Sequence, residues 1–342
     1  MSNFVDLVIA GPDFSGTTTQ INDIIEYFQN NKAVVKDLRG TENDVLFHAE
    51  LFSDERKRLG ETIRGGGEFL NLHEYQTTIQ KWRESGVTTR DNASFFYHIN
   101  TLLGGGGTNR DLRVGSMVKN DITTYINPNS ADVWIMEEPT RRGAGQVCRV
   151  IEQNRSKYDD VLDMRSAAMS HQTYRTEEFL RFRKPLREAG KIIVRSRSEE
   201  SGCYQIFDEK YIKSGMGVDE YLKLPGHKVA FANPPTHIFV VCGPVDWKEV
   251  DYLKLKEERK GRRVLDDHEN NPPLQLLINQ RYATDWIENF YKKGCAMYGS
   301  KEPMIVKFDI YNDIPKTREL MNQALQVAIL GNFLESIIKK NN

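Results

Sequence analysis

The stretch Phe4-Val-Asp-Leu-Val-Ile-Ala10 runs directly into Gly11-Pro-Asp-Phe-Ser-Gly-Thr-Thr-Thr19, and this junction decides the fold. The first segment is a short apolar run, which predicts a buried strand, and the second begins as a glycine-containing turn. Apolar residues then recur at the spacing of one helical face, at Ile21, Ile24, Ile25 and Phe28. Strand, turn and helix in this order are typical of a loop that holds phosphate groups.

The turn keeps the two glycines and the hydroxyl residue of a Walker A phosphate-binding motif at the expected spacing. Gly16 lets successive backbone N–H groups point at phosphate oxygens, and the helix N-terminus adds its positive end. The hydroxyl of Thr18 suits a ligand of Mg²⁺. A plain tight turn between strand and helix is the structural alternative. The residues expected to bind the phosphates of ATP are Gly11, Ser15, Gly16, Thr17, Thr18 and Thr19.

One position departs from the motif, because Thr17 stands where a lysine normally follows the second glycine. That lysine supplies a positive charge to the β- and γ-phosphates. Losing one preorganised stabiliser of a transition state typically costs about 3–4 kcal/mol, or about 10²–10³ in rate. We therefore expect either that another cation replaces the lysine or that the protein transfers phosphate poorly.

Further apolar runs recur near helical patterns, at residues 33–35, 133–136, 191–194 and 237–242. A parallel sheet with crossover helices requires this alternation. We predict an α/β fold with a doubly wound parallel sheet flanked by helices, formed by residues 1–39 and 132–342. The pattern loosens over residues 40–131, which we predict to be an insertion. Its glycine runs suit either hinges or a flexible surface connection.

Composition excludes several classes of protein. The 342 residues include 47 Lys and Arg against 48 Asp and Glu, so no overall basic field exists to hold a nucleic acid or an anionic membrane. The four cysteines stand far apart without a CxxC pair, which argues against a zinc site or a disulfide framework and predicts buried thiols. No apolar run approaches the roughly 18–20 residues of a membrane span. We expect a cytoplasmic protein that binds phosphates only locally.

Three later segments resemble the thymidylate kinase family of P-loop nucleoside monophosphate kinases in order and spacing. They span residues 137–149, 171–205 and 235–269. The first contains Glu-Glu-Pro-Thr, and the second places Arg175 and Arg197 in register with the family's arginines without a gap. The third carries the basic run Glu258-Arg-Lys-Gly-Arg-Arg263, which is similar to the family's lid. The resemblance covers about residues 4–35 and 133–335 but not the predicted insertion.

This resemblance implies a homodimeric kinase that uses Mg²⁺ and moves the γ-phosphate of ATP to dTMP or a related (deoxy)nucleoside monophosphate. Planar guanidinium groups suit the two charges of such an acceptor better than lysines do. An ordinary ion pair is the alternative role for either arginine taken singly. The acceptor-binding residues implied are Glu138, Pro139, Arg175, Arg197, Ser201, Gly202 and Gln205.

The implied catalytic residues are Asp13, Arg197, Arg259, Arg262 and Arg263. Asp13 resembles the loop aspartate that the family directs toward the acceptor or the metal, and capping of the following helix is its competing role. The last three residues belong to the lid-like run, which closes over transferring phosphates in the family. One of them is the expected replacement for the lysine missing at Thr17. A solvated charged surface is the alternative for this run.

A second departure concerns the residue before Arg197, where Ser196 replaces the family's aspartate. Both departures affect the handling of phosphate and metal. Three functions therefore stay open: a monophosphate kinase, a non-catalytic nucleotide-binding protein of the same fold, and a kinase that acts on a nucleoside or another hydroxyl compound.

Overall fold

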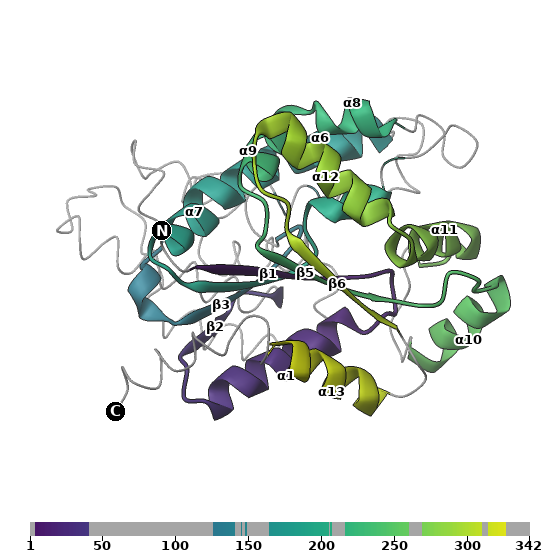
Figure 1. Cartoon of the computed structure of the whole chain (residues 1–342), viewed down its shortest axis with the longest axis horizontal. Coiled ribbons are helices and arrows are strands. Elements are labelled where there is room, and N and C mark those ends of the chain that lie inside the picture. The colour runs from purple at the N-terminus through teal and green to yellow at the C-terminus, as the bar shows by residue number, and fades with distance from the viewer. Residues whose placement is uncertain are drawn as a thin grey trace, which may run out of the picture.

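The computed structural model describes residues 4–40, 126–140, 145, 148, 164–204, 206, 216–259, 269–309 and 314–325. Within them, one six-stranded sheet forms the centre, and all its strands run parallel (Figure 1). The strands are β1 (Val5–Ala10), β2 (Val35–Asp37), β3 (Val133–Glu137), β4 (Ile192–Ser196), β5 (His237–Cys242) and β6 (Met304–Asp309). Their order across the sheet is β2-β3-β4-β1-β5-β6. The predicted α/β class is confirmed, whereas residues 41–125 of the predicted insertion lie outside the described part.

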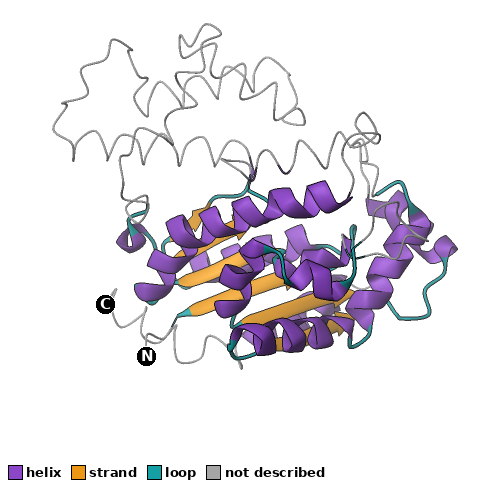
Figure 2. Cartoon of the chain, turned by 90° about the horizontal axis from the view of Figure 1, so that it is seen from above, coloured by secondary structure: helices purple, strands orange, loops and turns teal. Residues whose placement is uncertain are grey.

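The strand β1 occupies an interior position. It pairs with β4 from Val5↔Ile192 to Ile9↔Ser196, and on its other edge with β5 from Leu7↔His237 to Ala10↔Val240. Every residue of β1 is buried, because helices cover both faces of the sheet (Figure 2). The segment Phe4–Ala10 therefore becomes a central strand, as its apolar run predicts.

Two helices cover one face of the sheet: α1 (Thr17–Asn30) and α13 (Ile314–Ala324) (Figure 1). Ile21, Ile24 and Phe28 of α1 pack there against the side chains of Leu7 and Ile9. They are three of the four residues whose helical spacing predicted α1, and the fourth, Ile25, is partly buried against the same core. All three are nearly fully buried, so the periodicity identified the correct face.

The other face is covered by a larger group of helices. It comprises α6 (Met164–Glu178), η5 (Phe179–Arg183), α7 (Lys184–Glu188), α8 (Val218–Leu222), α9 (Pro225–Ala232), α11 (Pro272–Ala283) and α12 (Trp286–Tyr298). Their core includes Phe231, Ile278 and Phe290, packed with Val8 and Ile238 from the sheet. The helix α10 (Glu249–Arg259) follows β5 and packs beside α11, and two short 3₁₀ segments, η3 (Pro128–Ser130) and η6 (Glu199–Tyr204), precede β3 and follow β4, respectively.

The carboxyl end of β1 is a topological switch point. β1 leads into α1 on one face, whereas β4 leads into helices whose core lies on the opposite face, and β5 leads through α10 to α11 and α12 on that opposite face. In open α/β sheets, ligands bind in the crevice at such a point, outside the carboxyl ends of the strands. The sequence places its glycine-containing turn at this point of the sheet.

All four cysteines are buried free thiols, as predicted. Among the described helices, none is long and apolar enough to cross a membrane.

Candidate functional site

The loop Gly11–Gly16 connects β1 to α1 and lies directly against β5. A Cβ on Gly11 would collide with the carbonyl oxygen of Val241 at the end of β5, so the close approach requires glycine. Gly16 has φ of 90°, in the left-handed region that glycine adopts without strain. The N–H of Ser15 donates to the carbonyl of Pro12 at 3.2 Å and tightens the turn. Local sequence therefore explains the loop geometry.

No side chain of the described residues caps the N-terminus of α1. The first N–H groups of a helix have no acceptor within the helix, and together with the helix dipole they form a site for an anion. Thr18 and Thr19 are exposed at this end, and Thr17 is partly exposed. Asp13 therefore does not cap α1, which was the alternative role considered for this residue. The exposed hydroxyl of Thr18 and the uncapped N–H groups fit a Mg²⁺-bound triphosphate.

Arg259 brings a positive charge to this loop. It is the last residue of α10, and its Nη1 donates to the carbonyl oxygen of Phe14 at 2.7 Å. The same nitrogen lies 3.6 Å from the position that a Cβ on Gly16 would occupy. The lid-like basic run therefore places a guanidinium beside the residue that precedes Thr17. Arg262 and Arg263, also expected here, lie outside the described residues.

Asp13, on the same loop, pairs with the expected acceptor arginine. Nη2 of Arg197 donates to Oδ1 of Asp13. Arg197 follows β4 with φ of 68°, an uncommon backbone conformation for a residue with a Cβ. Its N–H donates to the carbonyl of Ile9 at 3.0 Å, and its guanidinium lies 4.8 Å from the ring centre of Tyr204. The side chains of Arg197 and Asp13 remain 26% and 15% exposed, so this pair is partly buried but still accessible to solvent.

Arg175, the second expected acceptor arginine, lies in a different environment. Its Nε donates to Oε1 of Glu138 at 2.7 Å and its Nη1 to the hydroxyl of Tyr221 at 2.9 Å. The side chains of this ion pair are only 2% and 3% exposed. Burial by itself lowers the pKa of Arg175, but Glu138, Tyr221 and Glu199 together outweigh this effect and raise the pKa well above its usual value. Arg175 therefore holds the carboxyl end of β3 in this structure.

The other expected acceptor residues that the structure describes lie in the segments that follow β3 and β4. Pro139 follows Glu138 through a cis peptide bond. Ser201 and Gly202 are buried in the 3₁₀ segment η6 (Glu199–Tyr204), where a Cβ on Gly202 would collide with the ring of Tyr221. Gln205 lies outside the described residues. The structure thus places two expected arginines at two locations: Arg197 at the phosphate loop and Arg175 in the interior.

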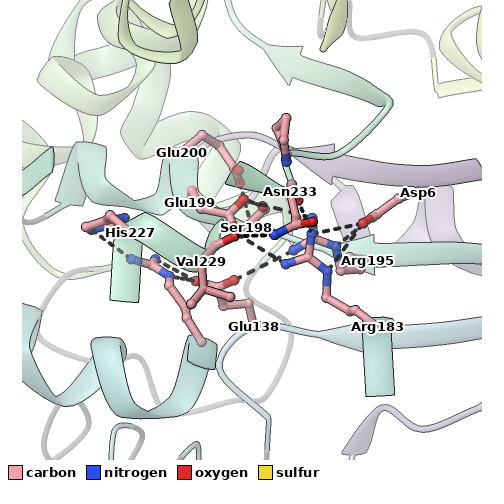
Figure 3. Close-up of polar contacts among 12 residues, drawn as sticks. Asp6, Glu138, Arg183, Arg195, Ser198, Glu199, Glu200, His227, Val229 and Asn233 are labelled. Carbon is pink, nitrogen blue, oxygen red and sulfur yellow. Dashed lines mark hydrogen bonds and ion pairs between the residues drawn. The ribbon is translucent and has the colours of Figure 1, made fainter. Parts of the chain in front are cut away.

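The interior location belongs to a buried network of charges that the sequence analysis missed (Figure 3). Asp6, the second residue of β1, accepts from Nε of Arg195 at 2.8 Å and from Nη2 of Arg183 at 2.9 Å. Arg183 also pairs with Glu199 at 3.4 Å. Burial raises the pKa of Asp6, but Arg195 and Arg183 outweigh it, and the pKa falls below its usual value. A signal was available, since Asp6 and Arg195 interrupt two apolar strand segments.

Glu200 differs electrostatically from the other acids of the network. Its Oε1 accepts from the N–H of Ser198 at 2.8 Å, and its Oε2 from the hydroxyl of Tyr291 at 3.3 Å. Burial raises the pKa of Glu200 to about 7, and the neighbouring charges of Glu138 and Glu199 act in the same direction. The folded protein therefore binds a proton here more tightly than the unfolded chain does.

This shift predicts a pH-dependent stability difference between the wild type and Glu200→Gln. The stabilisation by the protonated carboxyl is complete below the unfolded pKa of about 4.5 and is lost as pH rises through about 7. The substituted amide cannot ionise, so its contribution to stability does not change with pH. The free energy of unfolding of Glu200→Gln should therefore rise relative to that of the wild type by up to about 3 kcal/mol between pH 5 and pH 8. Urea unfolding at each pH measures the two free energies of unfolding. Subtracting one from the other removes the contributions of the other titrating groups, because both proteins contain them. The exposed control Glu302→Gln should show a flat difference, and a flat difference for Glu200→Gln would contradict the assignment.

Comparison of the chain with models of known protein families found no match, and comparison with curated proteins found none either. The geometry at the carboxyl end of β1 is therefore the basis on which a function is inferred.

Proposed function

We propose that this protein transfers the γ-phosphate of ATP to a nucleoside or deoxynucleoside monophosphate, with dTMP or a related pyrimidine as the first choice. The observation that carries the proposal is the composition of one site at the switch point. There, an uncapped helix N-terminus, the guanidinium of Arg259 and the Asp13–Arg197 pair all meet on the loop Gly11–Gly16. Phosphoryl transfer depends on positioning and on stabilisation of negative charge, which these groups supply.

The donor phosphates are assigned to the loop and the first turn of α1. Backbone N–H groups from Gly16 to Thr19 bind phosphate oxygens, and Thr18 holds Mg²⁺, which neutralises charge on the phosphates. Arg259 takes the role of the absent lysine, because it reaches the loop from α10 while Thr17 carries no charge. The Phe14 carbonyl fixes the guanidinium in place before any substrate binds.

The acceptor phosphate is assigned to Arg197. This side chain is a quarter exposed and already binds an anionic oxygen, the carboxylate of Asp13, so a phosphate oxygen can be bound in the same manner. Arg175 is too deeply buried in its pair with Glu138 to offer its guanidinium to a substrate in this structure. We therefore assign Arg175 a positioning role: it holds Glu138 and Pro139 beside the carboxyl end of β4.

A second candidate is a catalytically impaired nucleotide-binding protein of the same fold. The burial of Arg175 and the absence of charge at Thr17 and Ser196 favour it. A third candidate is a kinase that phosphorylates a nucleoside hydroxyl, and it is favoured by the pairing of both arginines with carboxylates. Both candidates predict that no monophosphate is a substrate.

The discriminating experiment measures ADP production from Mg²⁺-ATP with a panel of nucleoside monophosphates and nucleosides. We expect turnover of one monophosphate by the wild type, and a decrease of at least about 100-fold in kcat/KM in Arg197→Ala. Turnover of a nucleoside instead would support the third candidate. Tight binding of ATP without turnover of any panel member would support the binding protein.

A further inference from the structure

Gln275 is a buried amide whose two ends both contact the phosphate loop. It lies in the first turn of α11, where Asn271 caps the helix by accepting from the N–H of Leu274 at 3.2 Å. The Gln275 side chain is nearly fully buried. Its Nε2 donates to Oδ2 of Asp13 at 2.7 Å, and its Oε1 accepts from the backbone N–H of Asp13 at 3.3 Å. A residue 262 positions away thus binds both the carboxylate and the backbone of Asp13.

The carboxylate of Asp13 is consequently held from two sides. Oδ2 accepts from Gln275, while Oδ1 accepts from Arg197. Among the described residues, the other charged group placed at the loop is Arg259, which reaches Phe14 from α10, and Tyr204 lies beside Arg197. With one donor on each oxygen, the Asp13 carboxylate has a single favoured orientation, and that orientation fixes the guanidinium of Arg197.

The helix that carries Gln275 is itself rigidly placed. Leu274, Ile278 and Tyr282 bury one side of α11 in the main core. One turn after Gln275, Oδ1 of Asn279 accepts from the N–H of Gly243 at 2.8 Å, directly after β5. The same face of α11 therefore binds the loops that follow β1 and β5, and α10 packs beside it.

We propose that Gln275 is a positioning residue: it orients the carboxylate of Asp13 and, through it, the guanidinium of Arg197 that receives the acceptor phosphate. This inference rests on the proposed function, since Arg197 is assigned to the acceptor there. Gln275 acts through Asp13 and has no assigned contact with substrate. Its loss should therefore affect the monophosphate far more than ATP.

The most informative variant is Gln275→Glu, which keeps the shape of the side chain but places a second carboxyl beside that of Asp13. Two carboxyls in contact cannot both ionise readily, so they share a proton at low pH and repel each other at high pH. Gln275→Met removes both hydrogen bonds without adding charge. Gln280→Glu is the matched control, because it makes the same change at an exposed position of the same helix.

Steady-state kinetics of the full-length proteins at pH 6 and pH 8 test the proposal, with the monophosphate that the wild type accepts. For Gln275→Glu we expect kcat/KM for the monophosphate to fall about 100-fold at pH 8 and at most about tenfold at pH 6. Gln275→Met should lose about tenfold at both pH values. KM for ATP should stay within about twofold of the wild type in all variants, and Gln280→Glu should behave as the wild type.

Several outcomes would overturn the proposal. They are wild-type kinetics in Gln275→Glu, an equal loss at both pH values, and an equal loss in Gln280→Glu. Thermal unfolding of the same variants separates this failure from a failure of the proposed function. If the wild type turns over no monophosphate, the proposed function and the positioning role fall together. The contact still predicts that Gln275→Glu loses more thermal stability than the wild type and Gln280→Glu as pH rises from 6 to 8. If the wild type is active and only the kinetics of Gln275→Glu are unchanged, the positioning role alone falls.

Discussion

Arg259→Ala should lower kcat for phosphoryl transfer by about 10²–10³, because it removes the positive charge that reaches the phosphate loop beside Gly16. The loss should appear in kcat more than in KM, since the charge that develops on the transferring phosphate is greatest in the transition state. Steady-state kinetics with saturating ATP and acceptor measure it. Lys254→Ala is the matched control, because it removes an exposed cation from the same helix, and it should leave kcat unchanged.

The double variant Thr17→Lys/Arg259→Ala tests whether Arg259 supplies the charge of the missing lysine. If Arg259 takes the place of the lysine of the Walker A motif, a lysine at position 17 should restore kcat to within about tenfold of the wild type. Rescue would identify the role of the charge, not merely its importance for folding. Failure of rescue in a double variant that unfolds at the wild-type temperature would show that Arg259 does something other than replace the lysine.

The largest effect on stability is expected from Asp6→Asn. Asp6 is the carboxylate shared by Arg183 and Arg195, and all three side chains are at most 4% exposed. The substitution keeps the volume but removes the charge, so two buried guanidinium groups lose their main counter-charge. Breaking a buried ion pair by removing one partner typically costs about 3–5 kcal/mol. Urea unfolding at pH 7 measures the change.

The control for this experiment is Asp219→Asn, which breaks the exposed ion pair between Asp219 and Lys293. Exposed pairs of this kind contribute little, so the unfolding midpoint should not change measurably. Equal midpoints for Asp6→Asn and the wild type would contradict the assignment of Asp6 as the counter-charge that stabilises Arg183 and Arg195 in the folded protein.

Much of the sheet could be predicted from the sequence, because its central strands are buried on both faces and consist of apolar runs. The expected segment 237–242 coincides with β5. The two edge strands, β2 and β6, were harder to predict from the sequence. β2 begins at Val35 and not at residue 33, because the N–H of Ala33 still donates to the carbonyl of Phe28 at the end of α1. β6 was missed, since only Phe308 of this half-exposed edge strand is buried.

The candidate site was predictable where its parts are local in sequence. The loop Gly11–Gly16 and the exposed Thr18 follow from the order of strand, turn and helix. The family resemblance also indicated Asp13 and Arg197, which the structure brings together, and Arg259, which it places at the loop. These three residues are far apart in the sequence, so the spacing of residues along the chain could not predict the contacts between them.

The remaining parts depend on long-range packing and could not be derived from local patterns. Gln275 reaches Asp13 because α11 packs in the core beside the switch point, and no spacing rule connects the two residues. Arg175 was expected at the acceptor, yet Glu138 and Tyr221 enclose it. An arginine's partner is set by the three-dimensional neighbourhood, and here a carboxylate 37 positions away is that partner.

The most direct test of the central claim follows the γ-phosphate itself. Wild-type protein is incubated with Mg²⁺-ATP labelled at the γ-phosphate and the panel of monophosphates, and the labelled products are separated. We expect label in one nucleoside diphosphate, at a rate reduced at least about 100-fold in Arg197→Ala. Label that appears only in inorganic phosphate, or that stays in ATP while the protein binds the nucleotide, would contradict the proposed function.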